Sequence, residues 1–293
     1  RAFAAPTLAS LPRRTMDGAP NDYAGVLAAL ARYLDALHLR SPDTMRLVWH
    51  PSCHLKRPGA DGSLVEIGAA RFLEIVGEAG GEAAQDQPAS DRVTGVDFAG
   101  PEAALAKLEV RLGQTTYTDF LSLLRLGEGW RVVSKLFAPR DASAVAFAET
   151  TPPATSHGEI GAVLAEFIAA CRTSDGARLR SVLHPSCRTF AARRDGSLRE
   201  VTAEAFVERT SSVYAPLPLG EGVARYNKVV SIDKSGPQTA VAKVQTGYLL
   251  EAGQLAVDPD AGRGEWLFTN HLMLMRLGGG WTVVSRTYSA QAA

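Results

Sequence analysis

Two short motifs occur twice in this chain, and their duplication constrains the fold more than any other feature. His50–Cys53 reads His-Pro-Ser-Cys, and Asp61–Leu64 reads Asp-Gly-Ser-Leu. The same motifs return at His184–Cys187 and Asp195–Leu198, each 134 positions later. A period of this length predicts two copies of a whole domain rather than a solenoid of short repeats.

The chain is long enough for two such domains. It has 293 residues, of which 46% are hydrophobic, and this suffices for two cores built from about 120 to 140 residues each. We expect residues 1–21, rich in Ala and Pro, to be a disordered tail or a processed leader. The domains are then 22–140 and 156–293, joined by a linker at 141–155.

Charge and composition exclude several classes of protein. Lys plus Arg and Asp plus Glu both number 31, so the net charge is zero and neither nucleic acid nor an anionic membrane is expected as a partner. No apolar run approaches the roughly 18 residues that span a bilayer. Three cysteines are too few for a disulfide framework and favour a reducing, cytoplasmic location, unless the N-terminal stretch is a targeting remnant.

The first part of each copy has helical periodicity. Apolar residues in Tyr23–His38 recur at the spacing of one helix face, with Asn21 or Asp22 as the cap. A short helix over Thr44–Trp49 must end before Pro51. The further helices that we expect are Gly68–Glu78, Ile160–Cys171, Gly176–Leu183 and one that begins at Thr202.

The period then changes from 3.6 to two, which predicts successive strands. The expected strands are 92–98, 103–112, 116–126 and 130–137 in the first copy, and 224–232, 239–249, 266–277 and 281–288 in the second.

One of these strands indicates how the copies pack. Tyr117 and Leu121 are apolar on one face of strand 116–126, and Phe120 and Leu124 are apolar on the other. Both faces must be covered, one by helices and the other most economically by a second sheet. We therefore expect the copies to pair within one chain as a pseudo-dimer, and the protein to be a monomer.

This order of elements resembles the nuclear transport factor 2-like superfamily, and within it the putative lumazine-binding and SnoaL-like branch. The resemblance covers about residues 22–140 and 156–290. It rests on the His-Pro turn, the Asp-Gly-Ser-Leu hairpin, Tyr117–Leu121, Trp130–Lys135 and their second-copy equivalents.

The resemblance implies an α+β fold of two tandem cone-shaped, cystatin-like barrels, each a curved antiparallel sheet wrapped on helices with a pocket at its open end. The superfamily includes ketosteroid isomerases, polyketide cyclases, dehydratases and binding modules, so the fold does not give the function.

Asp119 is the candidate catalytic residue, because it interrupts an apolar strand face. An acidic group there either has a raised pKa suited to a general base or ligand contact, or pairs with Lys135 across the sheet or caps a loop. The resemblance favours a carboxylate inside the cone. The second copy has Asn270 at this position, so at most one half could abstract a proton.

The two His-Pro motifs invite two interpretations. His50 and His184 could bind the last carbonyls of a helix, or lie at the rim of a pocket. Together with Cys53 and Cys187 they could also form a zinc site, but we expect the cysteines to be small buried residues and no metal or other cofactor to be bound.

Aromatic residues complete the candidate pockets, although aromatic residues at helical spacing are equally typical of a core. His271 replaces Phe120 in the second copy, and we expect it at the interface between sheets. The candidate ligand contacts are Tyr33, Trp49, His50, Tyr117 and Asp119 in the first copy, and Phe167, His184, Phe268 and Asn270 in the second.

Three functions remain open from the sequence. The first is a module that binds a small molecule, aromatic or heterocyclic in character, in a concave apolar pocket. The second is an isomerase-, cyclase- or dehydratase-like enzyme that uses Asp119 as its base. The third is a non-catalytic protein-interaction module whose cones are filled by side chains.

Overall fold

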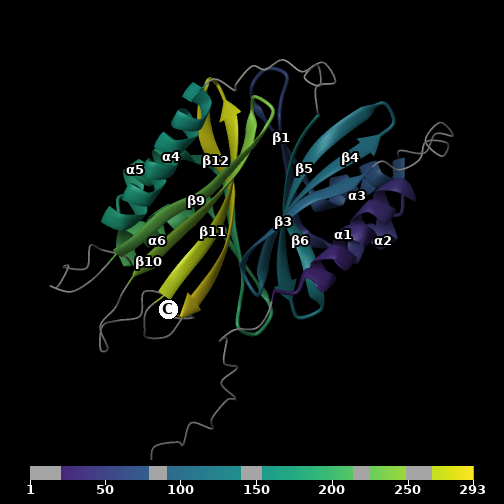
Figure 1. Cartoon of the computed structure of the whole chain (residues 1–293), viewed down its shortest axis with the longest axis horizontal. Helices are drawn as coiled ribbons and strands as arrows, with labels where there is room; N and C mark the ends of the chain where they lie inside the picture. Colours follow the sequence, from purple (N-terminus) through teal and green to yellow (C-terminus); the bar gives the residue numbers. More distant parts are fainter. Residues whose placement is uncertain (1–20, 79–90, 140–153, 214–224, 249–265, 293) are drawn as a thin grey trace, which may run out of the picture.

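The computed structural model describes residues 21–78, 91–139, 154–213, 225–248 and 266–292. The predicted tail and linker lie almost entirely outside these residues. The described chain forms two units with the same order of elements, and they are shown in Figure 1.

The first unit comprises α1 (Tyr23–His38), α2 (Pro42–Arg46), β1 (Trp49–Pro58), β2 (Leu64–Gly68), α3 (Ala69–Glu78), β3 (Arg92–Gly100), β4 (Ala103–Leu112), β5 (Thr115–Leu126) and β6 (Gly129–Pro139). The second comprises α4 (Ala154–Thr173), α5 (Gly176–Val182), β7 (Leu183–Ala192), β8 (Leu198–Thr202), α6 (Ala203–Val213), β9 (Arg225–Ser235), β10 (Thr239–Tyr248), β11 (Trp266–Leu277) and β12 (Gly280–Ala292).

The two sheets have the same topology. Each has six strands, in the orders β2-β1-β6-β5-β4-β3 and β8-β7-β12-β11-β10-β9. The predicted α+β fold in two tandem copies is confirmed, with two corrections. The sheets are open rather than closed barrels, and each contains one parallel pair, β1 with β6 and β7 with β12, so they are mixed rather than purely antiparallel.

The start of α1 is fixed by one side chain. Asp22 accepts a hydrogen bond from the Gly25 backbone N–H at 2.8 Å, as an N-cap should. Its second oxygen accepts a hydrogen bond from the Trp130 indole at 3.0 Å. The cap therefore also attaches the helix to the first residues of β6.

The His-Pro motif lies in a strand, which corrects its predicted place at a helix end. The second helix stops at Arg46, and His50 and Pro51 belong to β1. The pairing of β1 with β6 shifts register between Trp49 and His54, so the motif forms an irregularity in the strand. Proline is tolerated at this position because it has no backbone N–H, and a residue in a bulge does not need to donate a hydrogen bond to the neighbouring strand.

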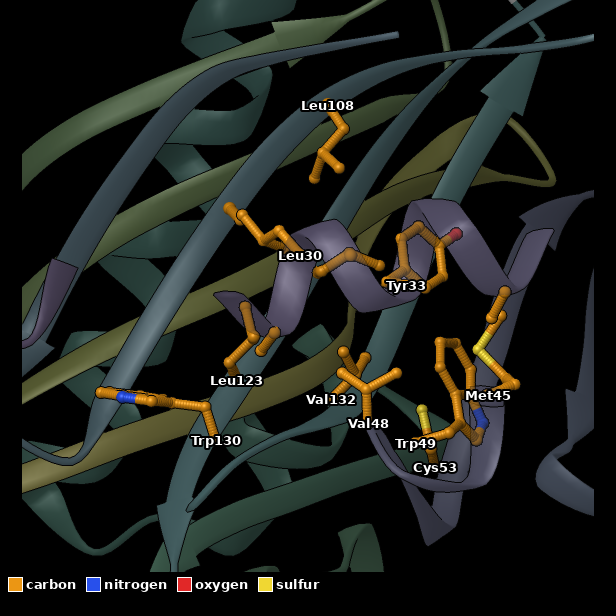
Figure 2. Packing of buried hydrophobic residues seen from close by; sticks show 14 of the residues in the cluster. Leu30, Tyr33, Met45, Val48, Trp49, Cys53, Leu108, Leu123, Trp130 and Val132 are labelled. Carbon is orange, nitrogen blue, oxygen red and sulfur yellow. The ribbon is translucent and has the colours of Figure 1, made fainter. Parts of the chain in front are cut away.

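Helices cover one face of each sheet, and the other faces of the two sheets meet in the middle of the molecule (Figure 1). In the first unit, α1 lies over the sheet and directs Leu30 and Tyr33 into a core that includes Leu123 and Val132 (Figure 2). All four side chains have no exposed surface. A matching core forms under α4 and α6.

A further apolar layer joins the two sheets. Phe120 of β5, fully buried, packs in a cluster with Met273 of β11 and Val284 of β12. The prediction that strand 116–126 needs cover on both faces is therefore confirmed, because Leu121 faces the helices while Phe120 faces the other sheet.

Reciprocal contacts show that the two units are related by an approximate two-fold axis. The Lys107 ammonium lies 2.9 Å from both carboxylate oxygens of Asp233. In the mirrored contact, the Lys243 ammonium lies 2.7 Å from Asp97. Lys243 and Asp233 are the sequence equivalents of Lys107 and Asp97, so the interface is isologous, as in a symmetric dimer.

The Asp-Gly-Ser turns take part in the same interface. Gly196 has a φ of 80° and Gly62 a φ of 77°, a region that glycine adopts without strain. The Gly127 N–H donates to the Gly196 carbonyl at 2.9 Å, and the Gly278 N–H donates to the Gly62 carbonyl at 3.3 Å. A Cβ on Gly196 would lie 3.1 Å from the Gly127 nitrogen. Both turns therefore need glycine for their shape, and Gly196 needs it also for the close approach of the other unit.

No helix in the described part of the chain is both long and apolar enough to cross a membrane.

Candidate functional site

The first cone contains a buried cluster of three polar side chains. Tyr33 of α1 donates its hydroxyl hydrogen to Asp119 of β5 at 2.8 Å, and the Lys135 ammonium of β6 lies 2.7 Å from both the Tyr33 hydroxyl and the same Asp119 oxygen. Asp119 and Tyr33 have no exposed surface, and Lys135 is 5% exposed. The cross-sheet pairing of Asp119 with Lys135, one of the two alternatives from the sequence, is what the structure shows.

Aromatic rings enclose this ion pair. The Lys135 ammonium lies 4.7 Å from the ring centroid of Phe137 and 5.8 Å from that of Phe72, distances at which a cation is attracted to the ring face. Burial raises the pKa of the Tyr33 hydroxyl well above its usual range, and the neighbouring Asp119 carboxylate raises it further. The hydroxyl therefore stays protonated and acts as a donor.

Of the other aromatic candidates in the first cone, Trp49 belongs to the packed core around this cluster, whereas Tyr117 is only partly buried. The Trp49 and Tyr33 rings are stacked with centroids 6.0 Å apart, and Trp49 is 2% exposed. Figure 2 shows both rings beside each other under α1. Tyr117 lies further along β5, in edge contact with Phe137.

The second cone contains a cavity. It is small: the centres of water-sized molecules can occupy about 70 Å³ of it. Of the sequence candidates, Phe167, Phe268 and Asn270 line it. The remaining lining residues are Cys171, Thr189, Arg199, Val201, Phe206, Arg209, Thr210, Thr246, Arg286 and Tyr288.

Asn270 holds the position that Asp119 has in the first cone. Its amide nitrogen donates to the Val244 carbonyl at 3.1 Å, and its amide oxygen accepts from Arg286 Nε at 2.9 Å. The Arg286 guanidinium carbon lies 4.7 Å from the ring centroid of Phe206 and 4.4 Å from that of Tyr288. Arg286 is thus the equivalent of Lys135, on an equivalent strand and among equivalent rings.

The two cones differ most at the positions around these groups. Leu55, Val76 and Val110 are buried in the first core, with at most 5% exposure. Their equivalents in the second copy are threonines, and all of these line the cavity. The pairs are Leu55 and Thr189, Val76 and Thr210, and Val110 and Thr246.

Two further lining positions change from an apolar residue to arginine. Val65 becomes Arg199, and Ile75 becomes Arg209. These residues were not among the candidates from the sequence. A position-by-position comparison of the two copies would have found them, because it shows the change from an apolar to a polar residue. Core positions that are apolar in one copy and polar in the other indicate a cone that is no longer filled.

The candidate histidines do not line the cavity. The ring Nδ1 of His50 accepts a hydrogen bond from the Ser52 N–H at 3.1 Å, and Nδ1 of His184 does the same with Ser186. Burial lowers the pKa of both imidazoles, which keeps Nδ1 free to accept. Each Nδ1 therefore bonds a backbone N–H within its own motif, which differs from the predicted binding of helix carbonyls.

The cysteines are free thiols, with Cys53 and Cys187 buried in separate cores. Burial raises the pKa of Cys187 to about 11. No group of three or more potential metal ligands gathers among the residues that the structure describes.

His271 lies where the sequence comparison predicted it. Its Nε2 is 3.1 Å from Asp97 of the other sheet, and its side chain is fully buried. This confirms an interface position for the residue that replaces Phe120.

Comparisons with solved structures list several similar chains. A structure from Shewanella baltica OS155, described as an NTF2-like protein of unknown function, is 21% identical with a TM-score of 0.39, and covers 49% of this chain and 99% of its own. An NTF2-like protein of unknown function from Methylobacillus flagellatus KT is 22% identical with a TM-score of 0.37, and covers 43% and 98%. A ketosteroid isomerase-like protein from Erwinia carotovora atroseptica SCRI1043 is 12% identical with a TM-score of 0.35, and covers 46% and 96%. No curated protein matches the chain.

One family model matches both copies, at residues 21–138 and 155–252. These two segments include most of the chain, although the second ends before β11 and β12, which carry Asn270 and Arg286. The chain therefore belongs to the putative lumazine-binding family, whose model matches it in two tandem segments.

Proposed function

We propose that this protein binds a small planar molecule in the second cone, and that the first cone is a filled structural partner. The observation that carries the proposal is the difference between equivalent positions. Leu55, Val76 and Val110 fill the first cone, whereas threonines at their equivalents line a cavity in the second. Polar residues at core positions make a domain less stable, because apolar packing is lost. A domain that keeps its fold in spite of this is expected to use those residues to contact a bound molecule.

The lining favours a flat ligand. Phe167, Phe268 and Tyr288 present aromatic rings, and the three threonines supply hydroxyl groups. Apolar and aromatic walls with a few polar groups are typical of sites for aromatic and heterocyclic molecules. The description of the family points to the same class, since lumazine is a fused heterocycle.

The geometry supports binding more than catalysis. Asp119 is fully buried and paired with Lys135, so a substrate could not reach it without breaking that ion pair. Around the second cavity the described lining contains no carboxylate. Its thiol, Cys171, has a pKa raised by burial to about 11, the opposite of what a nucleophile needs.

Native mass spectrometry of the gently purified protein tests the proposal. We expect the folded chain to carry one small molecule, which denaturation releases for identification. The control is the double variant Thr189→Leu, Thr246→Val, which restores the first-cone residues and should carry none. A ligand bound equally by wild type and variant would place the site elsewhere and contradict the proposal.

A further inference from the structure

The second cone contains a cation, Arg286, for which the described residues supply no anion. In the first cone, the Lys135 charge is neutralised by Asp119 at 2.7 Å. At the equivalent position the second cone has Asn270, which offers Arg286 an amide oxygen but no negative charge. Among the described residues no carboxylate pairs with Arg286.

The Arg286 guanidinium is also held in place. It is partly buried between the rings of Phe206 and Tyr288. Its Nε donates a hydrogen bond to the Asn270 amide oxygen. The Asn270 amide nitrogen donates in turn to the Val244 carbonyl, which fixes the orientation of the amide. No described group accepts a hydrogen bond from its two Nη atoms, although the side chain lines the cavity. A guanidinium with one edge fixed and the Nη groups available is suited to a planar oxyanion.

A second substitution removes another oxygen from the same place. The Tyr33 hydroxyl of the first cone lies 2.7 Å from the Lys135 ammonium. Its equivalent in the second copy is Phe167, which is 1% exposed and has no hydroxyl. Of the two oxygens that surround the cation in the first cone, the Tyr33 hydroxyl is therefore missing in the second, and the Asp119 carboxylate oxygen is replaced by the neutral amide oxygen of Asn270.

We infer that the second cone binds an organic carboxylate, whose carboxyl group pairs with Arg286 and takes the place of the first cone's own Asp119 and Tyr33 oxygens. This inference rests on the proposed function and names the class of ligand. The planar body of the ligand lies among the aromatic rings of the cavity. An aromatic or heterocyclic acid has both parts.

The internal duplication supplies the test variant. Asn270→Asp restores the carboxylate of the first cone, where the same position already tolerates an ion pair across the same two strands. The restored Asp neutralises Arg286 and competes with an anionic ligand, but leaves the apolar walls intact. Asn270→Leu is the matched control, because it removes the amide oxygen without adding a charge.

The experiment is titration calorimetry of the full chain with two probes of one shape, 2-naphthoate and the neutral 2-naphthamide. Wild type should bind the carboxylate at least about tenfold more tightly than the amide, since charge-assisted hydrogen bonds are about twice as strong as neutral ones. Asn270→Asp should remove this preference while the affinity for the amide changes less than about twofold. Asn270→Leu should keep the preference for the carboxylate.

Each other outcome has a definite meaning. Equal affinities of wild type for both probes would overturn the carboxylate inference and leave the proposed binding function standing. A preference for the carboxylate that persists in Asn270→Asp would also overturn it, because the anion would then bind away from Arg286. Absence of binding of either probe at millimolar concentration would contradict the inference and the proposed function together.

Discussion

Lys107 on β4 and Asp233 on β9 form an ion pair across the interface of the two sheets, with the ammonium 2.9 Å from both carboxylate oxygens. The mirrored pair of Lys243 and Asp97 shares its carboxylate with His271. The two halves are thus symmetric in architecture but differ in detail, and the predictions below use each half as the control for the other.

Acid should weaken the interface at Asp97. Burial alone would raise the pKa of Asp97, but hydrogen bonds from His271 and Lys243 outweigh it and lower the pKa to about 2. The folded pKa lies below the unfolded value of 3.8, so this stabilisation is present above pH 3.8 and is lost as the pH falls towards 2. Because the side chain is 46% exposed, solvent screening limits the effect to on the order of 1 kcal/mol.

His271 adds to this loss at higher pH. Burial lowers the pKa of its imidazole, and the Asp97 carboxylate offsets part of that shift. A lowered pKa means that stability declines as the pH falls below 6.5 through the folded value. The free energy of unfolding, measured with urea from pH 7 to pH 2, should decline continuously. In Asp97→Asn the part of the decline below pH 3.8 should be smaller. Stability that rises or stays flat on acidification would contradict the assignment.

Asp119→Asn should destabilise the first domain without affecting ligand binding. The substitution leaves the buried Lys135 ammonium without its counter-charge, and breaking a buried ion pair in this way costs about 3–5 kcal/mol. Chemical unfolding and ligand titration measure the two effects on the same sample.

The control for Asp119 replaces the whole cluster. The triple variant Tyr33→Phe, Asp119→Leu, Lys135→Met removes both charges and the hydroxyl together, and should recover most of the lost stability, because apolar replacements of a buried pair are often neutral. A variant Asp119→Asn that is fully stable but has lost ligand binding or turnover would instead support a functional role for the carboxylate.

Lys56→Met should uncouple the two domains. The Lys56 ammonium is almost fully buried and donates to the Ser186 and Val284 carbonyls of the other domain, both at 2.7 Å. Losing these bonds takes the Lys56 donor from the buried Val284 carbonyl and the partly buried Ser186 carbonyl, at a cost of about 2–3 kcal/mol.

Scanning calorimetry measures the coupling directly. We expect wild type to unfold in one transition and Lys56→Met to show an earlier or split transition. Arg57→Met is the control, since this partly exposed neighbour bonds, among the described residues, only the adjacent Pro58 carbonyl. Its loss should change stability by less than about 0.5 kcal/mol.

Much of the fold could be predicted from the sequence because local patterns are consistent with it. The period of two located the strands, and strand 266–277 has the predicted bounds. Phe120 and Leu121, apolar on opposite faces, were sufficient to predict the pairing of the sheets. The parallel pairing of β1 with β6 was not predictable in this way, because it joins residues about 80 positions apart through a bulge at the His-Pro motif.

The site was predicted only in part. Asn270, Phe167 and Phe268 were found because their counterparts in the first copy drew attention to them. Arg286 was missed, since a basic residue that alternates with apolar neighbours is also typical of a solvent-facing strand position. Only the geometry shows that Arg286 lines the cavity of the second cone, where no described carboxylate pairs with it.

The central claim is that one cone is filled and the other is open to a ligand, so the number of ligands per chain is the most direct test. Calorimetric titration with 2-naphthoate should give one site per chain for wild type. It should give none for the variant Thr189→Leu, Thr246→Val. The mirrored variant Leu55→Thr, Val110→Thr should lose stability but keep the single site. Two sites in wild type, or one site that survives filling of the second cone and disappears in the mirrored variant, would contradict the account.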